Sequence, residues 1–436
     1  MRSTDYVSAF GAMVLSLAGG FTAPTQETFA VLITGWVLCL GRHTITRIID
    51  SAAERAEKHV SSYRRFFSRA RWNPDEPFLD LFAKTLVPLT AKTGTIDLAG
   101  DDSTCAKSGR SVAFAGYFRD AVRSTVAQRV MHWAHCWVVL SLQVRCPFWP
   151  LRVISFPVMA RLYRKKTDGN KRHPLRTRGE LLLEMVAKIS SLLPEREFTL
   201  TVDGAYPSKE LLGDLPKNVQ LISRMRSDAA LNDLPGPRRM KGRGRQRQKG
   251  ERLKPLAEIA AGVKHWERRV VVVYGRKRVR LVHSFRALWW HVAKGRIFRV
   301  VIVRDPAGKQ KDDFFFTTDL NMDPARVVEL YAARWAIEEV FREGKQLAGF
   351  DDVQGWSPRS VERQAPFALL TLSLVKAWYL QHVAPKDRPK ELPSAAAMLT
   401  KLRMAHWQQR ISALSLPRNE MLQLTKALHA TLAAAS

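Results

Sequence analysis

The order of expected strands and helices between residues 94 and 225 restricts the fold more than any other feature of the sequence. Apolar, β-branched and aromatic runs predict strands, and one segment with helical periodicity predicts a helix among them. In chain order these are a strand at Thr95–Asp101, a hairpin of Trp133–Val144 and Leu151–Leu162, a helix at Arg178–Leu193, a strand at Glu197–Asp203, a short helix at Ser208–Leu212 and a strand at Val219–Met225. This order is typical of a mixed α/β domain with helices packed on a sheet.

Helical and β-rich segments flank this domain. Short helices are expected before about residue 75, and a β-rich block at 266–320 is followed by a long helix at Pro324–Leu347 and an apolar helix at Pro366–Tyr379. We therefore divide the chain into five regions. They are a helical region at 1–90, a first part of the core at 91–234, a basic loop and β-rich insertion at 235–320, a second part of the core at 321–383 and a C-terminal helical region at 384–436.

The chain is strongly basic, and its excess charge is concentrated in one segment. It carries 70 Lys and Arg residues against 40 Asp and Glu residues, for a formal net charge of +30. Between Arg238 and Arg304 there are 21 basic and three acidic residues, and the loop Arg238–Lys254 has no face that could form a core. An excess of this size predicts a polyanionic partner. The candidate DNA contacts in the loop are Arg243, Arg245 and Arg247.

A second candidate DNA contact lies near the N-terminus. Gly41–Arg47 follows one apolar stretch and opens another, as a tight turn into a helix would. This is compatible with a helix-turn-helix whose second helix directs Thr44, Thr46 and Arg47 toward DNA. An ordinary helical hairpin with a glycine turn explains the segment equally well.

Several other classes of protein are disfavoured. The apolar run Phe29–Leu40 is interrupted and shorter than the ~20 residues of a membrane-spanning helix. Four cysteines in 436 residues do not form a disulfide framework, which fits a reducing compartment. The stretch Lys241–Gly250 lacks the strand and the Gly-Lys-Ser/Thr ending of a P-loop, so no nucleotide cofactor is expected. A second possible metal site would consist of His132, His135, Cys136 and Cys146. These residues lack the paired spacing of zinc sites, so a zinc site is disfavoured.

Three acidic positions are placed where chemistry could occur. Asp101 and Asp102 close the first expected strand, Asp203 ends a later one, and Glu338 lies on the long helix. Carboxylates at the carboxyl ends of strands lie in the crevice above a sheet, where they can bind divalent ions that activate a water and stabilise the leaving oxygen of a phosphodiester. Taken singly, each could equally be a helix cap or a solvated surface acid.

The long helix adds basic and phenolic groups to one of these acids. Tyr331, Arg334, Glu338 and Lys345 are at offsets 0, 3, 7 and 14, which at about 100° per residue places them within one arc of roughly 60°. A DNA backbone that passes a metal site needs groups that bind its phosphates. A guanidinium, an ammonium and a phenol beside the carboxylate would supply them. An Arg334–Glu338 salt bridge alone would not explain the other two residues.

These residues resemble the motifs of a known family. Tyr331-(2)-Arg334-(3)-Glu338-(6)-Lys345 matches the Y-(2)-R-(3)-E-(6)-K signature of a large group of bacterial insertion-sequence DDE transposases. Asp102-Ser103-Thr104 is similar to that family's first motif, and Asp203-Gly204-Ala205-Tyr206 to its second. The resemblance covers most of the chain. It implies a ribonuclease-H-like mixed-sheet core with a β-rich insertion, an α-helical N-terminal DNA-binding domain and C-terminal helices.

The resemblance also implies an activity and a site. Two Mg²⁺ ions, which Mn²⁺ can replace, would be held by Asp102, Asp203 and Glu338, whereas Tyr331, Arg334 and Lys345 would contact DNA phosphates. The reaction would be cut-and-paste transposition of the element, by cleavage at its terminal inverted repeats and joining to target DNA. We also expect a homodimer on DNA and a cytoplasmic, nucleoid-associated bacterial protein. A base-stacking tryptophan of the insertion would be Trp289 or Trp290.

Two questions remain open from the sequence. Asp101 and Asp102 are adjacent, and strand alternation lets only one of them face the site; we favour Asp102 because Ser103 and Thr104 follow it. The alternative functions are a related DDE nuclease that cuts without joining, and a nucleic-acid-binding protein whose acids are structural.

Overall fold

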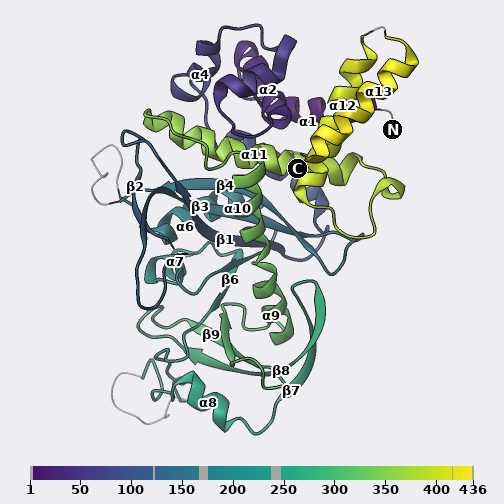
Figure 1. The fold of residues 1–436 in the computed structure, drawn as a ribbon. Coiled ribbons are helices and arrows are strands. Elements are labelled where there is room, and N and C mark those ends of the chain that lie inside the picture. The colour runs from purple at the N-terminus through teal and green to yellow at the C-terminus, as the bar shows by residue number, and fades with distance from the viewer. Residues whose placement is uncertain (1–2, 121–122, 166–174, 237–246, 415, 435–436) are drawn as a thin grey trace.

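The fold is described from a computed structural model, in which the described residues are 3–120, 123–165, 175–236, 247–414 and 416–434. Ten strands form one mixed sheet, with helices on its faces and a group of helices at one end of the molecule (Figure 1). The strands are β1 (Ile96–Ala106), β2 (Gly116–Arg119), β3 (Met131–Arg145), β4 (Val153–Tyr163), β5 (Phe198–Val202), β6 (Val219–Arg224), β7 (Glu267–Val273), β8 (Arg276–Leu288), β9 (Ile297–Arg304) and β10 (Asp313–Thr317). Among the described residues, no helix is both long and apolar enough to cross a membrane.

The central part of the sheet has the order β4-β3-β1-β5-β6. Strand β3 is antiparallel to both β1 and β4, whereas β1, β5 and β6 are parallel to one another. These strands are nearly free of exposed side chains, as expected for strands covered on both faces. The expected hairpin and mixed sheet are therefore confirmed, and the order is consistent with a ribonuclease-H-like core.

The β-rich block continues this sheet. Strand β10 pairs with β6, and β9, β8 and β7 follow in antiparallel order, so the sheet runs unbroken from the core into the block. The sequence predicts the block as an insertion between two parts of the core. Its position in the chain is as expected, but in space it is a lateral extension of the same sheet.

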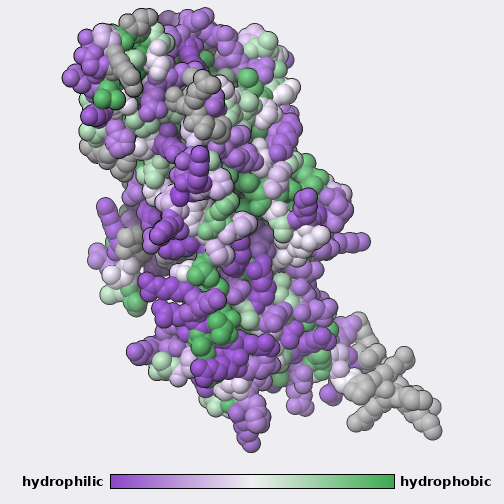
Figure 2. Space-filling model, turned by 90° about the vertical axis from the view of Figure 1, so that its right-hand side faces the viewer, coloured by the Kyte–Doolittle hydropathy of each residue, from purple (hydrophilic) through white to green (hydrophobic). Residues whose placement is uncertain are grey.

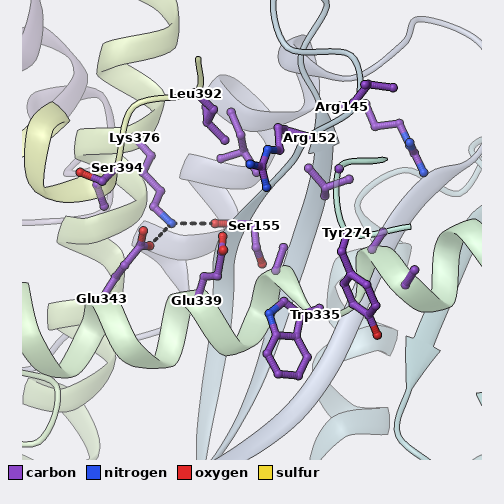
Figure 3. Close-up of a pocket in the computed structure, with 18 of the residues that line it drawn as sticks. Arg145, Arg152, Ser155, Tyr274, Trp335, Glu339, Glu343, Lys376, Leu392 and Ser394 are labelled. Atoms are coloured by element: carbon purple, nitrogen blue, oxygen red, sulfur yellow. Dashed lines mark hydrogen bonds and ion pairs between the residues drawn. The ribbon is translucent and has the colours of Figure 1, made fainter. Parts of the chain in front are cut away.

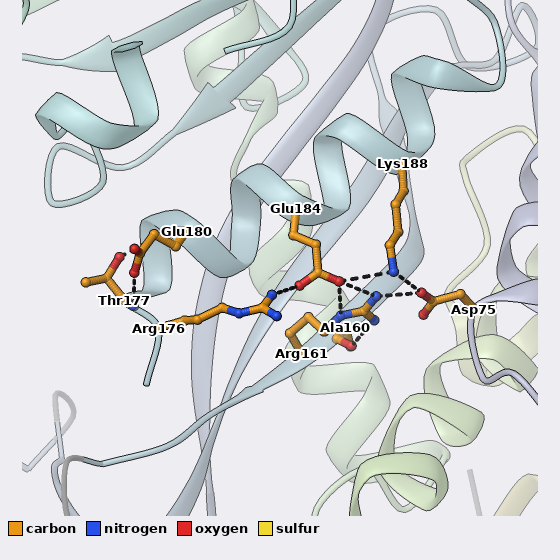
Figure 4. Close-up of polar contacts among 8 residues, drawn as sticks. All are labelled: Asp75, Ala160, Arg161, Arg176, Thr177, Glu180, Glu184 and Lys188. Atoms are coloured by element: carbon orange, nitrogen blue, oxygen red, sulfur yellow. Dashed lines mark hydrogen bonds and ion pairs between the residues drawn. The ribbon is translucent and has the colours of Figure 1, made fainter. Parts of the chain in front are cut away.

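Helix α6 (Arg178–Ser191) packs against β3 and β4, and α7 (Lys209–Gly213) follows β5. A capping box begins α6: the Thr177 hydroxyl accepts from the Glu180 N–H, and the Glu180 carboxylate accepts from the Thr177 N–H. Farther along α6, a group of charged side chains ties the helix to the rest of the molecule (Figure 4). In this group Asp75, which is 6 % exposed, accepts from Arg161 of β4 at 2.7 Å and from Lys188 at 2.6 Å. Both of these bases also contact Glu184 at 3.1 Å.

The prediction of one long helix at Pro324–Leu347 is wrong in one respect, because the segment forms two helices, α9 (Pro324–Ala333) and α10 (Ala336–Leu347). At the junction the backbone keeps helical dihedral angles, but the N–H groups of Ile337 and Glu338 bond to carbonyls three residues back. Such bonds tighten the helix locally. The other helices that follow β6 in the chain are α8 (Leu256–Gly262), α11 (Pro358–His382), α12 (Ala395–Ser412) and α13 (Arg418–Ala434), with a 3₁₀ turn at Pro385–Asp387.

The N-terminal helices are packed onto the core. They are α1 (Ser3–Ser16), α2 (Ala23–Leu38), α3 (Ile45–Ala52), α4 (Val60–Ser68) and α5 (Glu76–Asp80), with a π-helical turn at Leu81–Leu86 and 3₁₀ turns at Ala53–Arg55 and Val87–Leu89. Trp36 of α2 donates to the Ala348 carbonyl beyond α10 at 2.7 Å. One buried apolar cluster joins these helices, the sheet, α11 and α12, so this end of the molecule and the core share their interior. The domain boundaries expected from the sequence stay predictions.

Candidate active site

Strand β1 carries its two acids in mid-strand, which corrects the expectation that they close it. Pairing with β5 ends at Gly100↔Val202, but pairing with β3 continues to Ala106↔Ala134. The acids therefore follow the last parallel pair and are held by β3 on one side only. Since β5 also ends there, Asp203 follows it at the same edge.

Asp101 faces the helices α9 and α10. Its carboxylate is in ion-pair contact with the guanidinium of Arg334, whose side chain is 10 % exposed. Burial, with smaller contributions from the neighbouring Asp102 and Asp203, raises the pKa of Asp101 to about 6 in spite of the opposing charge of Arg334. A buried acid beside other carboxylates is held away from full ionisation, which is a mark of functional sites.

The other two acids approach the same guanidinium group. Glu338 lies 3.5 Å from Arg334, and its pKa is raised by burial and by Asp203, in opposition to Arg334. Asp203 accepts a hydrogen bond from the Tyr331 hydroxyl at 3.3 Å. Burial raises the pKa of Tyr331 to about 12, so that this hydroxyl stays protonated and donates. The structure thus brings Asp101, Asp203, Glu338, Tyr331 and Arg334 together.

Lys345 reaches the same face of β1 from the last turn of α10. Its ammonium donates to the Ser103 hydroxyl at 2.8 Å. Ser103 is two residues from Asp101, so both side chains lie on one face of the strand. The four residues expected to share an arc of the helix therefore do face one site, despite the tightening between α9 and α10.

Asp102 points to the opposite face of the sheet and is not brought to this group. Its carboxylate accepts from the Tyr206 hydroxyl at 2.9 Å and lies 3.2 Å from Arg178, the first residue of α6. The Cys136 thiol donates to it at 3.5 Å. The preference for Asp102 as the first acid of the site is accordingly revised in favour of Asp101, because side chains alternate along a strand and α9 and α10 cover the Asp101 face.

The acids suit a divalent ion in their chemistry but not in their present spacing. Carboxylate oxygens are the ligands that Mg²⁺ prefers. The charge of Asp203 raises the pKa of both Asp101 and Glu338, so its carboxylate repels theirs. A cation between them would relieve that repulsion. Among the described residues, however, no group of three or more His, Cys, Asp or Glu side chains stands close enough to hold a metal ion. Arg334 supplies the positive charge between Asp101 and Glu338 instead.

The other residues expected to contact DNA lie on separate elements. Arg47 is exposed on α3, whose N-cap Thr44 accepts from the Arg47 N–H at 3.3 Å. A helix-turn-helix arrangement of α2 and α3 is compatible with this geometry, although a DNA-binding role for it stays a prediction. Arg247 is exposed in the basic loop, whereas Arg243 and Arg245 lie outside the described residues.

Strands β7 and β8 present a basic surface that the sequence motifs did not indicate. Hydrophilic side chains dominate the lower part of the molecule, where these strands lie (Figure 2). The exposed basic residues of the two strands are Arg268, Arg269, Arg276, Lys277, Arg278 and Arg286. Both strands lie within the basic segment Arg238–Arg304, where the sequence concentrates its excess charge.

The two tryptophans proposed for base stacking differ in environment. Trp289 packs edge-on against Phe316, with ring centres 5.6 Å apart, at the margin of the main core. Trp290 instead has the ammonium groups of Lys249 and Lys294 over its ring, at 5.5 and 5.6 Å. Core packing therefore accounts for Trp289 but not for Trp290.

A cavity of about 610 Å³ lies on the other side of α10 (Figure 3). The tip of the β7–β8 hairpin closes one end, where Tyr274 meets Trp335 edge-on at 6.1 Å between ring centres. Inside it, Glu343 forms an ion pair with Lys376 at 2.5 Å. Nothing in the sequence motifs pointed to this cavity, because its walls come from β3, β4, the hairpin tip, α9, α10, α11 and α12.

A mixed sheet that gathers carboxylates, a guanidinium and an ammonium at the carboxyl end of its parallel strands is the arrangement of a nuclease-type enzyme. The family model described as DDE superfamily endonuclease matches residues 16–280, more than half of the chain. The chain belongs to this family, which supports a nuclease or transposase type of function with DNA as the substrate. Comparison with curated proteins gives no match. The matched part includes Asp101, Asp102 and Asp203 and ends before α9 and α10, so it does not cover Glu338, Arg334 and Lys345.

Proposed function

We propose that this protein is a DNA transposase that binds the ends of its own mobile element, cuts them in the presence of a divalent metal and joins them to target DNA. The observation that carries the proposal is the contact of one buried guanidinium, Arg334, with both Asp101 and Glu338. Asp203 is close enough to raise the pKa of both acids. Three acids from three separated segments thus converge on one point, beside the basic groups that DNA would need.

The roles follow from the chemistry of each side chain. Asp101, Asp203 and Glu338 would hold two Mg²⁺ or Mn²⁺ ions, which supply an activated water or hydroxyl and stabilise the leaving oxygen. Arg334 neutralises two of these acids in the absence of a cation, so it would be released toward a DNA phosphate when the cation takes its place. Lys345 would bind a second phosphate, and Tyr331 orients Asp203.

The basic segments would provide most of the affinity for DNA. The loop Arg238–Lys254, the exposed bases of β7 and β8, and Arg47 of α3 lie outside the acid cluster and can follow the phosphate backbone. Joining two ends requires at least two active sites, which favours a homodimer on the DNA. A complex of both ends with a single protomer, measured by mass, would contradict that expectation.

The test uses the purified full-length chain and a plasmid that carries the inverted repeats flanking its reading frame. With Mg²⁺ or Mn²⁺ we expect cutting at the repeats and joining of a pre-cut 3′ end to a second plasmid. Asp203→Asn should abolish both while DNA binding remains. Cutting without joining would support the nuclease alternative, and tight binding without cutting in either metal would support the non-catalytic one.

A further inference from the structure

Asp102 lies outside the acid cluster, yet three polar groups from three different elements converge on it. Tyr206 belongs to the turn that follows β5, Arg178 begins α6, and Cys136 is the β3 residue paired with the neighbouring Thr104. Its carboxylate accepts from Tyr206 at 2.9 Å, from Arg178 at 3.3 Å and from the Cys136 thiol at 3.5 Å. A carboxylate held by three donors has a fixed orientation, so the backbone that carries it is fixed as well.

The donors around Asp102 are themselves held in place. Tyr206 is 5 % exposed, and burial together with Asp102 raises the pKa of its hydroxyl, which therefore stays protonated. Arg178 is the first residue of α6, which begins at the Thr177–Glu180 capping box and is anchored farther along by the Asp75 group (Figure 4). The contacts of Asp102 therefore reach parts of the molecule that cannot move independently of the sheet.

These contacts lead back to the two aspartates of the site. The Asp102 N–H donates to the Asp101 carboxylate at 2.9 Å, so the peptide that Asp102 holds also orients Asp101. Tyr206 is three residues after Asp203, and its N–H bonds to the Asp203 carbonyl at 3.0 Å. Asp102 thus connects the strand of the first acid with the turn of the second, at the point where the pairing of β1 with β5 has ended.

We propose that Asp102 is a positioning residue, which fixes the backbone that carries Asp101 and Asp203 so that their carboxylates can turn from Arg334 and Tyr331 onto a divalent cation, and that it does not ligate the cation itself. The inference rests on the proposed function for the identity of the site. It assigns different roles to two adjacent aspartates that the sequence motif could not separate. Residues that orient the ligands of a metal affect metal affinity or activity by about 10–100-fold.

The test measures Mn²⁺ binding to the full chain by the electron paramagnetic resonance of free Mn²⁺, together with cutting of the inverted-repeat plasmid. Asp101→Asn should remove both. Asp102→Ala should raise the half-saturating Mn²⁺ concentration by about 10–100-fold and leave binding saturable. Asp102→Asn keeps an oxygen that can accept from Tyr206, so its shift should be smaller than that of Asp102→Ala. Tyr206→Phe should shift the concentration in the same direction, and combined with Asp102→Ala it should add little, since both act through one contact.

A matched control is Asp97→Asn, which alters a buried acid of the same strand that pairs with Arg326 at 2.6 Å and has no part in the site. It should leave Mn²⁺ binding unchanged, and thermal unfolding of each variant verifies that it folds. If Asp102→Ala does not fold, Asp102→Asn and Tyr206→Phe carry the test.

Two results would overturn the inference: loss of all Mn²⁺ binding in Asp102→Asn, which would make Asp102 a ligand, or an unchanged Mn²⁺ affinity in Asp102→Ala and Tyr206→Phe. The expected Mn²⁺ shifts without any DNA cutting would support the inference and contradict the proposed function. A wild-type chain that binds no Mn²⁺ would overturn both.

Discussion

The two faces of strand β1 carry adjacent aspartates in unlike surroundings. On one face Asp101 and Ser103 meet Arg334 and Lys345, which are side chains of the α9–α10 segment. On the other face Asp102 meets Tyr206 and Arg178, which belong to the interior framework of the sheet and α6. The position of an acid along a strand therefore does not define its role. The elements that cover each face decide whether it is available to a substrate.

The largest expected effect is on DNA cutting, and it should distinguish the face of α10 that carries Glu338 from the rest of this helix. Glu338→Gln removes a carboxylate of the cluster and should lower the rate of DNA cutting by about 10³-fold or more. The control is Glu339→Gln on the same helix, which lines the cavity behind α10 and should cut DNA at close to the wild-type rate. Equal reductions in the two variants would mean that the cluster around Arg334 is not the site of cutting.

The next largest effect is expected on DNA binding, when the basic loop is altered and the acid cluster is left intact. Substitution of the bases between Arg238 and Lys254 by Ser or Gln should weaken DNA binding and flatten its salt dependence, by roughly 0.9 in the log–log slope for each phosphate that is no longer neutralised. Binding is measured by fluorescence anisotropy over a series of salt concentrations. Lys386→Gln with Lys390→Gln, which changes two exposed bases of the segment after α11, is the control and should leave the slope unchanged. If the loop substitution left the salt slope unchanged, the loop would be solvated and would not contact DNA.

A smaller effect tests the basic group of the active face. Lys345→Ala should lower affinity for the DNA ends by about tenfold and the salt slope by about one, because the variant has no ammonium group to neutralise one of the phosphates. Ser103→Ala removes only the hydroxyl that accepts from this ammonium at 2.8 Å and should cost less. If Ser103→Ala had the larger effect, Lys345 would act through the strand and not through DNA.

The last prediction concerns stability instead of DNA binding, at a buried histidine of the same sheet. His135 pairs with Cys105 across β1 and β3, and burial lowers its pKa to about 4. An unfolded chain takes up this proton near pH 6.5 but the folded one does not, so stability is lost as the pH falls from about 6.5 to about 4, by up to about 1.4 kcal/mol per pH unit. His135→Gln should reduce that loss, measured by urea unfolding across this range.

Two further groups serve as internal checks on that measurement. His406 of α12, whose pKa burial also lowers to about 4, should behave in the same way, and a double variant should show the sum of the two effects. Asp101 acts with the opposite sign, because an acid whose pKa is raised to about 6 destabilises the fold as the pH rises from about 4 to about 6. A pH profile that is unchanged in the double variant would contradict the burial of both histidines.

Much of the fold and part of the site could be predicted from the sequence. Apolar runs marked the strands of the core with errors of a few residues at their ends, because burial on both faces requires such runs. The spacing of Arg334, Glu338 and Lys345 placed three groups on one face, because local helical geometry survives the junction between α9 and α10. The cavity behind α10 could not be foreseen, since the segments that form it are distant in the chain.

The mixed strand–helix order, the alignment of Arg334, Glu338 and Lys345 on one helix face and the concentration of positive charge between Arg238 and Arg304 follow from the sequence alone. These are local properties, set by the period of apolar residues and by composition. Only the tertiary structure decided that the β-rich block extends the central sheet and that Asp101, not Asp102, faces Arg334. The physical reason is that a strand presents two equivalent faces, and packing of α9 and α10 against one of them distinguishes the two.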